Sequence, residues 1–269
     1  MRAPSIDSAA AQTDIVMVEE DAYGIAGAVR VVLNRPAALN ALSEAMLAVL
    51  QQTLDRIAAS GARVVILAGA GRAFCAGHDL AEMRAHPDLD AYRDLFARCS
   101  RMMLTIVQMP QPVIAQVHGI ATAAGCQLVA MCDLAVAAQE ARFAVSGVNL
   151  GLFCATPSVP LARNVPRKQA LEMLLTGDFI SATEAAERGL INRAVPAEQL
   201  EREVATLAEK ICRKPRAAIR AGKGLFYRQM EMGLDAAYQL AGQTMACNMM
   251  EDATLEGTQA FLEKRPPRW

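Results

Sequence analysis

Two segments of the chain combine small residues in a way that leaves backbone N–H groups open to a ligand. Residues 73–80 read AFCAGHDL, and residues 118–128 read HGIATAAGCQL. Because Gly and Ala carry little or no side chain, a ligand atom can approach the backbone of such loops closely. Two N–H groups directed at one oxygen form an oxyanion hole, which stabilises negative charge that develops during a reaction. The two loops therefore predict binding and activation of a carbonyl group.

Size and composition indicate a chain that can bury a full hydrophobic core. They give no excess of positive charge that would suit nucleic acid or an anionic membrane. Of its 269 residues, 53% are hydrophobic and 4% aromatic, so Ala, Val, Leu and Met must fill the interior. The formal net charge of −1 gives no reason to expect nucleic acid or an anionic membrane as a partner. Residues 102–132 carry no charge, but Pro110, Pro112 and Gly119 interrupt them. We therefore expect a buried strand, loop and helix there rather than a membrane span.

Cysteines and histidines show no metal-binding spacing. The seven cysteines are scattered, odd in number and without a C-x-x-C pair. This pattern is typical of free, mostly buried thiols in a reducing cytosol, so we expect a cytoplasmic protein. The three histidines, His78, His86 and His118, lack ligand spacing to a cysteine pair, so we expect no metal and no resident cofactor. Residues 1–14 lack an apolar segment and make a poor mitochondrial presequence, so we expect a mobile tail.

Hydrophobic periodicity predicts the elements that position the two loops. Each loop follows a short apolar strand and leads to a helix, and this order recurs at a spacing of roughly forty residues, which indicates stacked β-β-α units with parallel strands. Ser43 and the pair Ser181 and Glu184 have the types and spacing of helix N-terminal caps. The predicted strands are 15–20, 28–33, 64–67, 113–117 and 134–138, and the predicted helices are 43–59, 89–108, 123–131, 167–176, 181–189, 197–213 and 252–264, with one long segment over 215–250.

Six motifs in this order resemble the crotonase, or enoyl-CoA hydratase/isomerase, family, from about residue 15 to the C-terminus. The resemblance implies an α/β fold, a spiral of repeated β-β-α units over residues 15–200. It also implies a helical C-terminal trimerisation region over 201–269, a homotrimer or a dimer of trimers, and an acyl-CoA thioester as substrate or ligand. The motifs lie at residues 34–42, 74–80, 112–133, 176–185, 189–190 and 256–265.

The resemblance also assigns individual residues. It places the oxyanion donors on the backbone N–H groups of His78 and Ala124, the second at a helix start where the helix dipole favours negative charge. It implies that Phe261 and Lys264 reach the CoA from the C-terminal helix, of the same or of a neighbouring subunit, where a lysine suits the CoA phosphates. The implied CoA contacts are Ala37, Ala38, Leu39, Ala76, Asp79, Leu80, Phe261 and Lys264, and the implied acyl-pocket residues are Asn149, Cys154 and Thr156.

The chain departs from the family pattern at the proton-transfer positions. The two glutamates of the family's hydratases fall on Gln127 and Gly147. A glutamine amide has no acid–base equilibrium near neutral pH, and glycine has no side chain. Efficient hydration by the usual route is therefore not expected, and restoring both glutamates is expected to raise it. The substitutes considered are the side chains of His78, Asp79, Glu82, His118 and Asp133, with a structural role favoured for most of them.

Three functions stay open from the sequence. The first is an enzyme that acts on a CoA thioester by isomerisation, hydrolysis, decarboxylation or weak hydration. The second is a non-catalytic acyl-CoA-binding or regulatory oligomer, and the third is a structural oligomer without a ligand.

Overall fold

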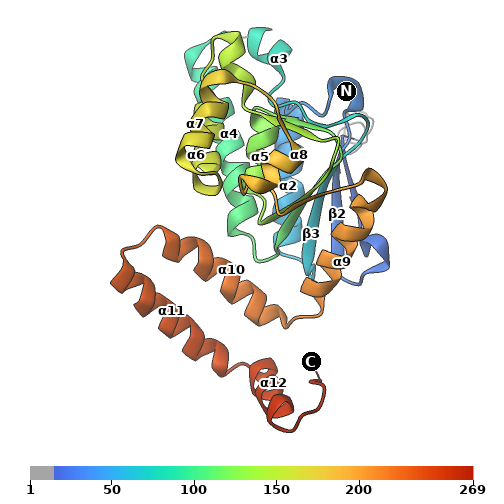
Figure 1. Ribbon diagram of the computed structural model, residues 1–269, viewed down its shortest axis with the longest axis vertical. Coiled ribbons are helices and arrows are strands. Elements are labelled where there is room, and N and C mark those ends of the chain that lie inside the picture. Colours follow the sequence, from blue (N-terminus) through green and yellow to red (C-terminus); the bar gives the residue numbers. More distant parts are fainter. Residues whose placement is uncertain (1–14, 86, 269) are drawn as a thin grey trace, which may run out of the picture.

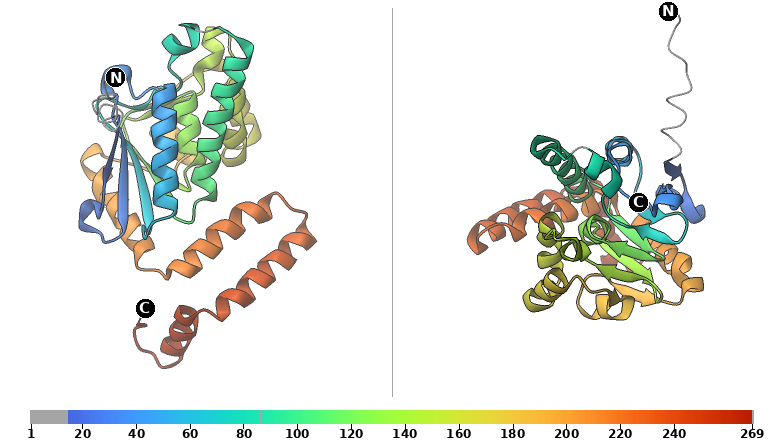
Figure 2. Two further views of the ribbon diagram at one scale, coloured as in Figure 1. Left: turned by 180° about the vertical axis from the view of Figure 1, so that it is seen from behind. Right: turned by 90° about the horizontal axis from the view of Figure 1, so that it is seen from above.

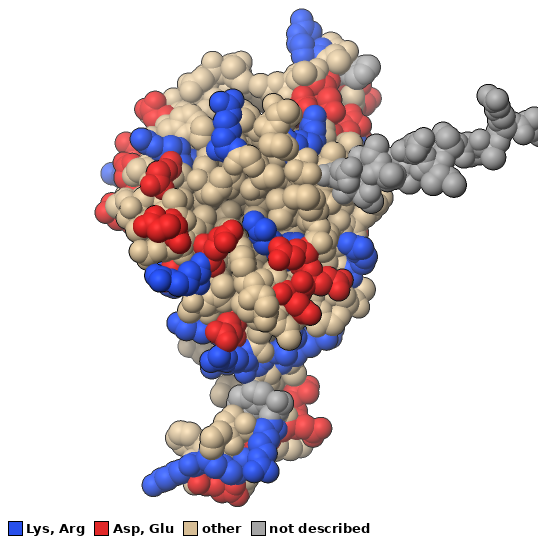
Figure 3. Space-filling view, turned by 90° about the vertical axis from the view of Figure 1, so that its right-hand side faces the viewer, with Lys and Arg blue, Asp and Glu red and all other residues tan. Residues whose placement is uncertain are grey.

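The computed structural model describes residues 15–85 and 87–268. The tail predicted for residues 1–14 lies outside them. Figures 1 and 2 show a sheet-and-helix core from which the last helices extend as an arm. Acidic and basic side chains are interspersed over the face seen in Figure 3, in keeping with the net charge of −1. Within the described ranges, no helix is both long enough and apolar enough to cross a membrane.

A six-stranded sheet forms the centre of the core. Its order is β1-β2-β3-β5-β7-β10, with β1 antiparallel to β2 and every other neighbouring pair parallel. Both faces are covered, which explains why β3 reads as a continuous apolar run: Val65 and Leu67 join one hydrophobic cluster, and Val64 and Ile66 join the other. The strands are β1 (Val16–Glu19), β2 (Ala28–Leu33), β3 (Val64–Gly69), β5 (Val113–Val117), β7 (Leu134–Ala138) and β10 (Arg193–Val195).

A second sheet of short strands completes the predicted repeat. Strands β4 (Ala73–Cys75), β6 (Ile120–Thr122) and β8 (Arg142–Ala144) each follow a strand of the large sheet, namely β3, β5 and β7. They pair in parallel in the order β4-β6-β8, and β9 (Ile180–Ser181) adds an antiparallel edge. The stacked β-β-α arrangement is therefore present, and β4 and β6 form the beginnings of the two small-residue loops.

Helices cover one face of the large sheet and carry the caps expected from the sequence. The Ser43 side chain accepts a hydrogen bond from the Met46 N–H, and Ser181 forms a capping box with Glu184. Figure 1 shows α2, α4 and α5 side by side, with α3 at one end of the molecule and α6 and α7 along one side. These helices are α2 (Glu44–Ala58), α3 (Leu80–Ala85), α4 (Leu89–Gln108), α5 (Ala124–Met131), α6 (Ala155–Asn164), α7 (Arg167–Thr176) and α8 (Ala182–Glu187).

The C-terminal part begins with a helix that belongs to the core packing. Helix α9 (Leu200–Cys212) buries Leu200, Val204 and Ala208 against the second face of the sheet. The arm starts only with α10 (Arg216–Met230), followed by α11 (Leu234–Met249) and α12 (Asp252–Leu262). The long segment named over 215–250 is thus two helices, with a turn between them at Gly233. Large apolar side chains of the arm are exposed, among them Phe226, Leu234, Tyr238, Met245 and Phe261.

A buried ion pair fastens the arm to the sheet. Lys223 of α10 donates to Asp133 Oδ2 at 2.7 Å, and Tyr227 donates to Asp133 Oδ1 at 2.9 Å. The same carboxylate accepts from the Val113 N–H, so Asp133 has a structural role. Burial raises the pKa of the Asp133 carboxyl and lowers that of the Lys223 ammonium, and the attraction between the two opposes both shifts.

Candidate functional site

The two small-residue loops meet at Gly77 and Ala124. A Cβ on Gly77 would lie 3.2 Å from the Ala124 nitrogen and 2.9 Å from the Ala123 Cβ, and Gly77 itself has a φ of 93°. A Cβ on Gly125 would lie only 2.0 Å from the Cys75 carbonyl oxygen. Glycine is therefore required at both positions, because any larger residue would separate the loops.

Two backbone N–H groups are left unpaired where the loops meet. His78 forms an isolated parallel bridge with Leu42, in which the Leu42 N–H donates to the Gly77 carbonyl and the Asp79 N–H donates to the Leu42 carbonyl. The N–H of His78 therefore points to the other side of the segment. Ala124 is the first residue of α5, so its N–H has no partner within the helix. Neither group donates a hydrogen bond within residues 15–85 and 87–268.

The backbone conformation before Ala124 is unusual. Ala123 has a φ of 51° and a ψ of −120°, a region that residues with a Cβ rarely adopt. Such a conformation persists only where surrounding contacts enforce it, and it is common at ligand sites. Here the N–H of Ala123 donates to the Ala144 carbonyl, which fixes the turn into α5. The strained residue therefore sets the direction of the Ala124 N–H.

A cavity of about 230 Å³ opens beside the two N–H groups. Leu80 and Met83 of α3 and Phe96 of α4 line one side. The segment that leads from the short helical turn over Ser146–Leu150 into α6 lines the other. The cavity is thus mainly apolar. Its further lining residues are Ala76, His78, Ala123, Ala124, Ser146, Gly147, Leu150, Leu152, Phe153, Cys154, Ala155, Thr156 and Pro157.

Gln127 and Gly147, the positions of the absent glutamates, differ in the space around them. Gln127 is buried, with 4% of its surface exposed, and its Oε1 has no hydrogen-bond partner in the described part of the chain. A Cβ on Gly147 would lie 2.5 Å from the Leu152 carbonyl oxygen and 2.8 Å from the Cys154 sulfur. A glutamate at 147 would therefore have to displace both atoms, and the rise in hydration expected from restoring both glutamates stays a prediction.

The two ring nitrogens of His78 are buried without a polar partner in the described part of the chain. Neither ring nitrogen is exposed to solvent or bonded to a described residue. The ring packs edge-on against Phe96, with 5.5 Å between the ring centres. Burial lowers the pKa of the imidazole, and the nearby backbone of Leu42 partly offsets the shift. Sequence reasoning named this histidine but did not predict that its nitrogens would be unpaired.

The predicted acyl-pocket residues are found in two places. Cys154 and Thr156 line the cavity. The Cys154 sulfur accepts a hydrogen bond from the Gly147 N–H at 3.2 Å, and burial raises the pKa of the thiol. Asn149 is not among the lining residues; its Nδ2 donates to the Gly177 carbonyl at 3.3 Å, which directs the side chain toward the end of α7.

The predicted CoA turn is fastened to the first loop by Asn40, whose role the sequence did not reveal. Ala37 and Ala38 lie in a short helical turn over Pro36–Ala38, and Leu39 follows with a φ of 52°. The buried Asn40 donates to the backbone carbonyls after β3 and in β4, and its Oδ1 accepts from the Arg35 N–H. The Ala76 N–H donates to the Leu39 carbonyl. The turn and the oxyanion loop therefore form one unit.

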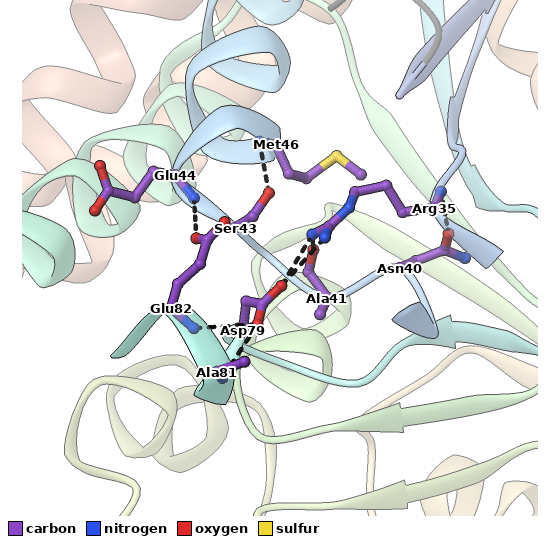
Figure 4. Close-up of polar contacts among 9 residues, drawn as sticks. All are labelled: Arg35, Asn40, Ala41, Ser43, Glu44, Met46, Asp79, Ala81 and Glu82. Carbon is purple, nitrogen blue, oxygen red and sulfur yellow. Dashed lines mark hydrogen bonds and ion pairs between the residues drawn. The ribbon is translucent and has the colours of Figure 1, made fainter. Parts of the chain in front are cut away.

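Asp79 is occupied by contacts within the protein. Figure 4 shows its carboxylate between the Arg35 guanidinium and the start of α3. Oδ2 accepts from both terminal nitrogens of Arg35 at 3.2 Å, and Oδ1 accepts from the N–H groups of Ala81 and Glu82. Glu82 in turn accepts from the Glu44 N–H. These contacts place α3, with Leu80 and Met83, over the cavity.

The other predicted residues lie away from this site. The arm helix α12, which contains Phe261, lies at the end of the molecule opposite α3 (Figure 1), and Lys264 follows α12 in the chain. Phe261 is 83% exposed. His118 is bonded through Nε2 to the Gly71 carbonyl at 2.7 Å. Among the described residues, no group of three His, Cys, Asp or Glu is arranged to hold a metal ion.

The comparisons with known proteins agree with the architecture. A crystal structure of an enoyl-CoA hydratase from Mycobacterium smegmatis is 57% identical, covers 95% of this chain and 98% of its own, and superposes with a TM-score of 0.93. The crystal structure of human enoyl-CoA hydratase domain-containing protein 3 is 44% identical over 95% of this chain and 100% of its own, with a TM-score of 0.91. The expected fold is thereby confirmed.

Sequence relatives correct one expectation. The rat protein named enoyl-CoA hydratase domain-containing protein 3, mitochondrial, is 47% identical over 240 residues, which are 89% of this chain and 80% of that protein. It and its named counterparts from mouse, Xenopus laevis, human and zebrafish are all described as mitochondrial. This contradicts the prediction of a cytoplasmic protein. Free thiols indicate a reducing environment but not which compartment provides it.

The family assignment rests on nearly the whole described fold, from residue 24 onward. The sequence model of the family described as Enoyl-CoA hydratase/isomerase matches residues 24–269. This range includes both small-residue loops, the cavity segment and the helical arm. The chain belongs to the enoyl-CoA hydratase/isomerase family.

Proposed function

We propose that this protein binds an acyl-CoA thioester and activates its carbonyl through the backbone N–H groups of His78 and Ala124. The observation that supports this function is the contact between the loops at Gly77, beside which His78 and Ala124, both with an unpaired N–H group, line the same cavity. An oxygen held there receives two hydrogen bonds and the favourable potential of the α5 N-terminus. The carbon next to the carbonyl then becomes acidic, because its conjugate base is an oxyanion.

Rearrangement through an enolate fits this cavity better than addition of water. Hydration needs one group to activate water and another to deliver a proton, and each group is worth about 10²–10⁴-fold in rate. Gln127 and Gly147 provide neither. Proton removal and return at carbon, as in movement of a double bond along the acyl chain, requires only one base. We therefore favour isomerase-type chemistry on an enoyl-CoA over efficient hydration.

The CoA part of the ligand would follow the unit made by the Pro36–Ala38 turn and the first loop. Ala37 and Ala38 offer small side chains there, Leu39 is bonded to Ala76 of the first loop, and Ala76 and Leu80 line the cavity. Phe261 and Lys264 would be supplied by another subunit, since α12 lies far from the cavity of its own chain (Figure 1). The exposed apolar side chains of the arm would form the contacts of a trimer or a dimer of trimers.

A non-catalytic acyl-CoA-binding oligomer is the second candidate, and the absence of both glutamates favours it. The two candidates share binding and differ in turnover. Binding is tested by the thermal shift that acyl-CoA produces, because a ligand that binds the native state stabilises it. Turnover is tested with a panel of 2-enoyl-CoA and 3-enoyl-CoA thioesters, with double-bond position read by mass spectrometry and NMR. A shift without turnover supports the binding protein; no shift at millimolar ligand contradicts both.

A further inference from the structure

We propose that the imidazole of His78 is the base that removes and returns a proton at the carbon next to the thioester carbonyl. This role rests on the proposed function, because it requires the thioester oxygen to lie at the N–H groups of His78 and Ala124. It adds a reacting side chain to a site whose other identified groups are backbone donors.

The unpaired nitrogens of His78 are the first observation. A buried polar atom nearly always has a hydrogen-bond partner, and one without a partner calls for a functional explanation. Both ring nitrogens of His78 lack one, whereas His118 bonds to the Gly71 carbonyl at 2.7 Å. The His78 ring packs edge-on against Phe96, an apolar neighbour that leaves both nitrogens without a hydrogen bond to a described residue.

The second observation is the place of the ring beside the cavity. His78 and its neighbour Phe96 both line the cavity, and His78 also provides one of the two backbone donors. The carbon that loses the proton is bonded directly to the carbonyl carbon. A substrate oxygen on the His78 N–H therefore brings this carbon near the side chain of the same residue. The transfer requires the ring to turn about its Cβ–Cγ bond so that one nitrogen faces the cavity.

The third observation is that the described residues around the cavity offer no other base. Its only other titratable lining side chain is Cys154, and burial raises the pKa of that thiol, which keeps it protonated at neutral pH. Asp79 is held by Arg35 and by the start of α3, and Glu82 by the Glu44 N–H. Burial lowers the pKa of His78, so the imidazole is neutral at physiological pH and able to accept a proton.

The step balances without a further reactant. The C–H bond breaks, its electron pair forms the carbon–carbon double bond of the enolate, and the carbonyl π electrons move to the oxygen held by the two N–H groups. The proton passes to a His78 ring nitrogen. Its return to the same carbon restores the substrate. Its return two carbons further along an unsaturated chain shifts the double bond.

Exchange of the substrate proton for deuterium tests this role separately from turnover. Butyryl-CoA, which is saturated, is incubated with the whole protein in D₂O, and deuterium at the carbon next to the carbonyl is measured by NMR and mass spectrometry. We expect exchange with the wild-type protein and at least a 100-fold slower exchange with His78→Gln, within the range for loss of one general base. The backbone donor of residue 78 is unchanged in this variant, and His118→Gln is the matched control.

The outcomes separate this role from the proposed function. If wild-type exchange is present and His78→Gln exchanges equally fast, His78 is not the base, although the thioester still binds. If butyryl-CoA gives the wild-type protein no thermal shift, the proposed function fails first. A second variant, His78→Leu, distinguishes a base from a structural residue: it should lose exchange while its Tm rises, since an unpaired polar ring is replaced by an apolar side chain. A lower Tm for this variant would contradict the unpaired state of the ring.

Discussion

Gly77 and Ala124, 47 positions apart in the chain, approach so closely that a Cβ on the first would lie 3.2 Å from the nitrogen of the second. Glycine is needed at 77 for two reasons. A Cβ would come too close to Ala124, and the φ of 93° is unfavourable for any residue with a Cβ. This contact holds the β4 loop against the start of α5. His78 and Ala124, whose N–H groups are the proposed donors, both line the cavity.

The Gly77→Ala variant measures what this contact contributes. The added methyl group must push the loops apart, and the alanine must adopt a strained φ. We therefore expect the free energy of unfolding to fall by about 1–3 kcal/mol. We also expect the thermal shift by acyl-CoA to disappear. Gly222→Ala is the matched control: a Cβ there meets nothing within 4 Å, and alanine is the better helix former. Retention of the full ligand shift in folded Gly77→Ala would show that the loop contact does not matter for binding.

Single restorations of the two glutamates should behave differently. Gln127→Glu keeps nearly the same shape, so we expect a folded protein and, with one acid–base group restored, faster hydration of crotonyl-CoA by about 10²-fold. Gly147→Glu must displace the Leu152 carbonyl and the Cys154 sulfur, so we expect it to cost about 1–3 kcal/mol of stability and to leave hydration unchanged. Chemical denaturation and steady-state rates check both. A stable and active Gly147→Glu would mean that the Leu152 segment adapts.

The ion pair between Lys223 and Asp133 should control how firmly the arm is attached. With side chains only 7% and 13% exposed, loss of one partner leaves a buried charge, so Lys223→Met should lower the free energy of unfolding by about 3–5 kcal/mol. Tyr227→Phe removes one hydrogen bond to the carboxylate and should cost about 1.5–3 kcal/mol. Denaturant unfolding measures both. An equal and small effect of the two variants would mean that the arm is held mainly by its apolar contacts.

The titration of His78 predicts a pH dependence of stability. Its pKa in the folded protein is below the ordinary value of about 6.5, so the unfolded chain binds more protons between these two values, and stability falls as the pH drops through that window. Replacement by leucine removes this dependence. We expect the unfolding free energy of His78→Leu relative to wild type to increase as the pH is lowered from 7 to 5. Parallel pH profiles for the two proteins would argue against a neutral, buried imidazole.

The regular spacing of apolar residues along the sequence predicted much of the fold. Strands 28–33, 113–117 and 134–138 and helix 89–108 match the observed β2, β5, β7 and α4 residue for residue, because their apolar spacing is unbroken. Strands β4, β6 and β8 have three residues each, too few to show a period. Helix α6 contains Pro157 and Pro160, and two prolines in one short segment indicate a loop rather than a helix. The break before α11 is a turn at Gly233 inside a methionine-rich stretch with no change in composition.

The parts of the site that depend on backbone N–H groups could be predicted from the sequence. The parts that depend on where a side chain points could not. Small residues in order indicated the loops that provide the two N–H groups. The direction of Asn149 and the lack of space at Gly147 depend on a chain reversal at Gly151, with a φ of 77°, which brings the Leu152 carbonyl back toward residue 147. The partners of Asn40 and Asp79 also come from distant segments. A single sequence does not show such contacts.

The central claim is that the thioester carbonyl is held and polarised by the N–H groups of His78 and Ala124. Infrared difference spectroscopy of butyryl-CoA labelled with ¹³C at the carbonyl measures this directly. Two hydrogen bonds to the oxygen weaken the C=O bond, so the carbonyl stretch of the bound ligand should move to lower frequency than that of the free ligand in water. A bound ligand whose carbonyl stretch stays at the free value, or moves to higher frequency, would contradict the account.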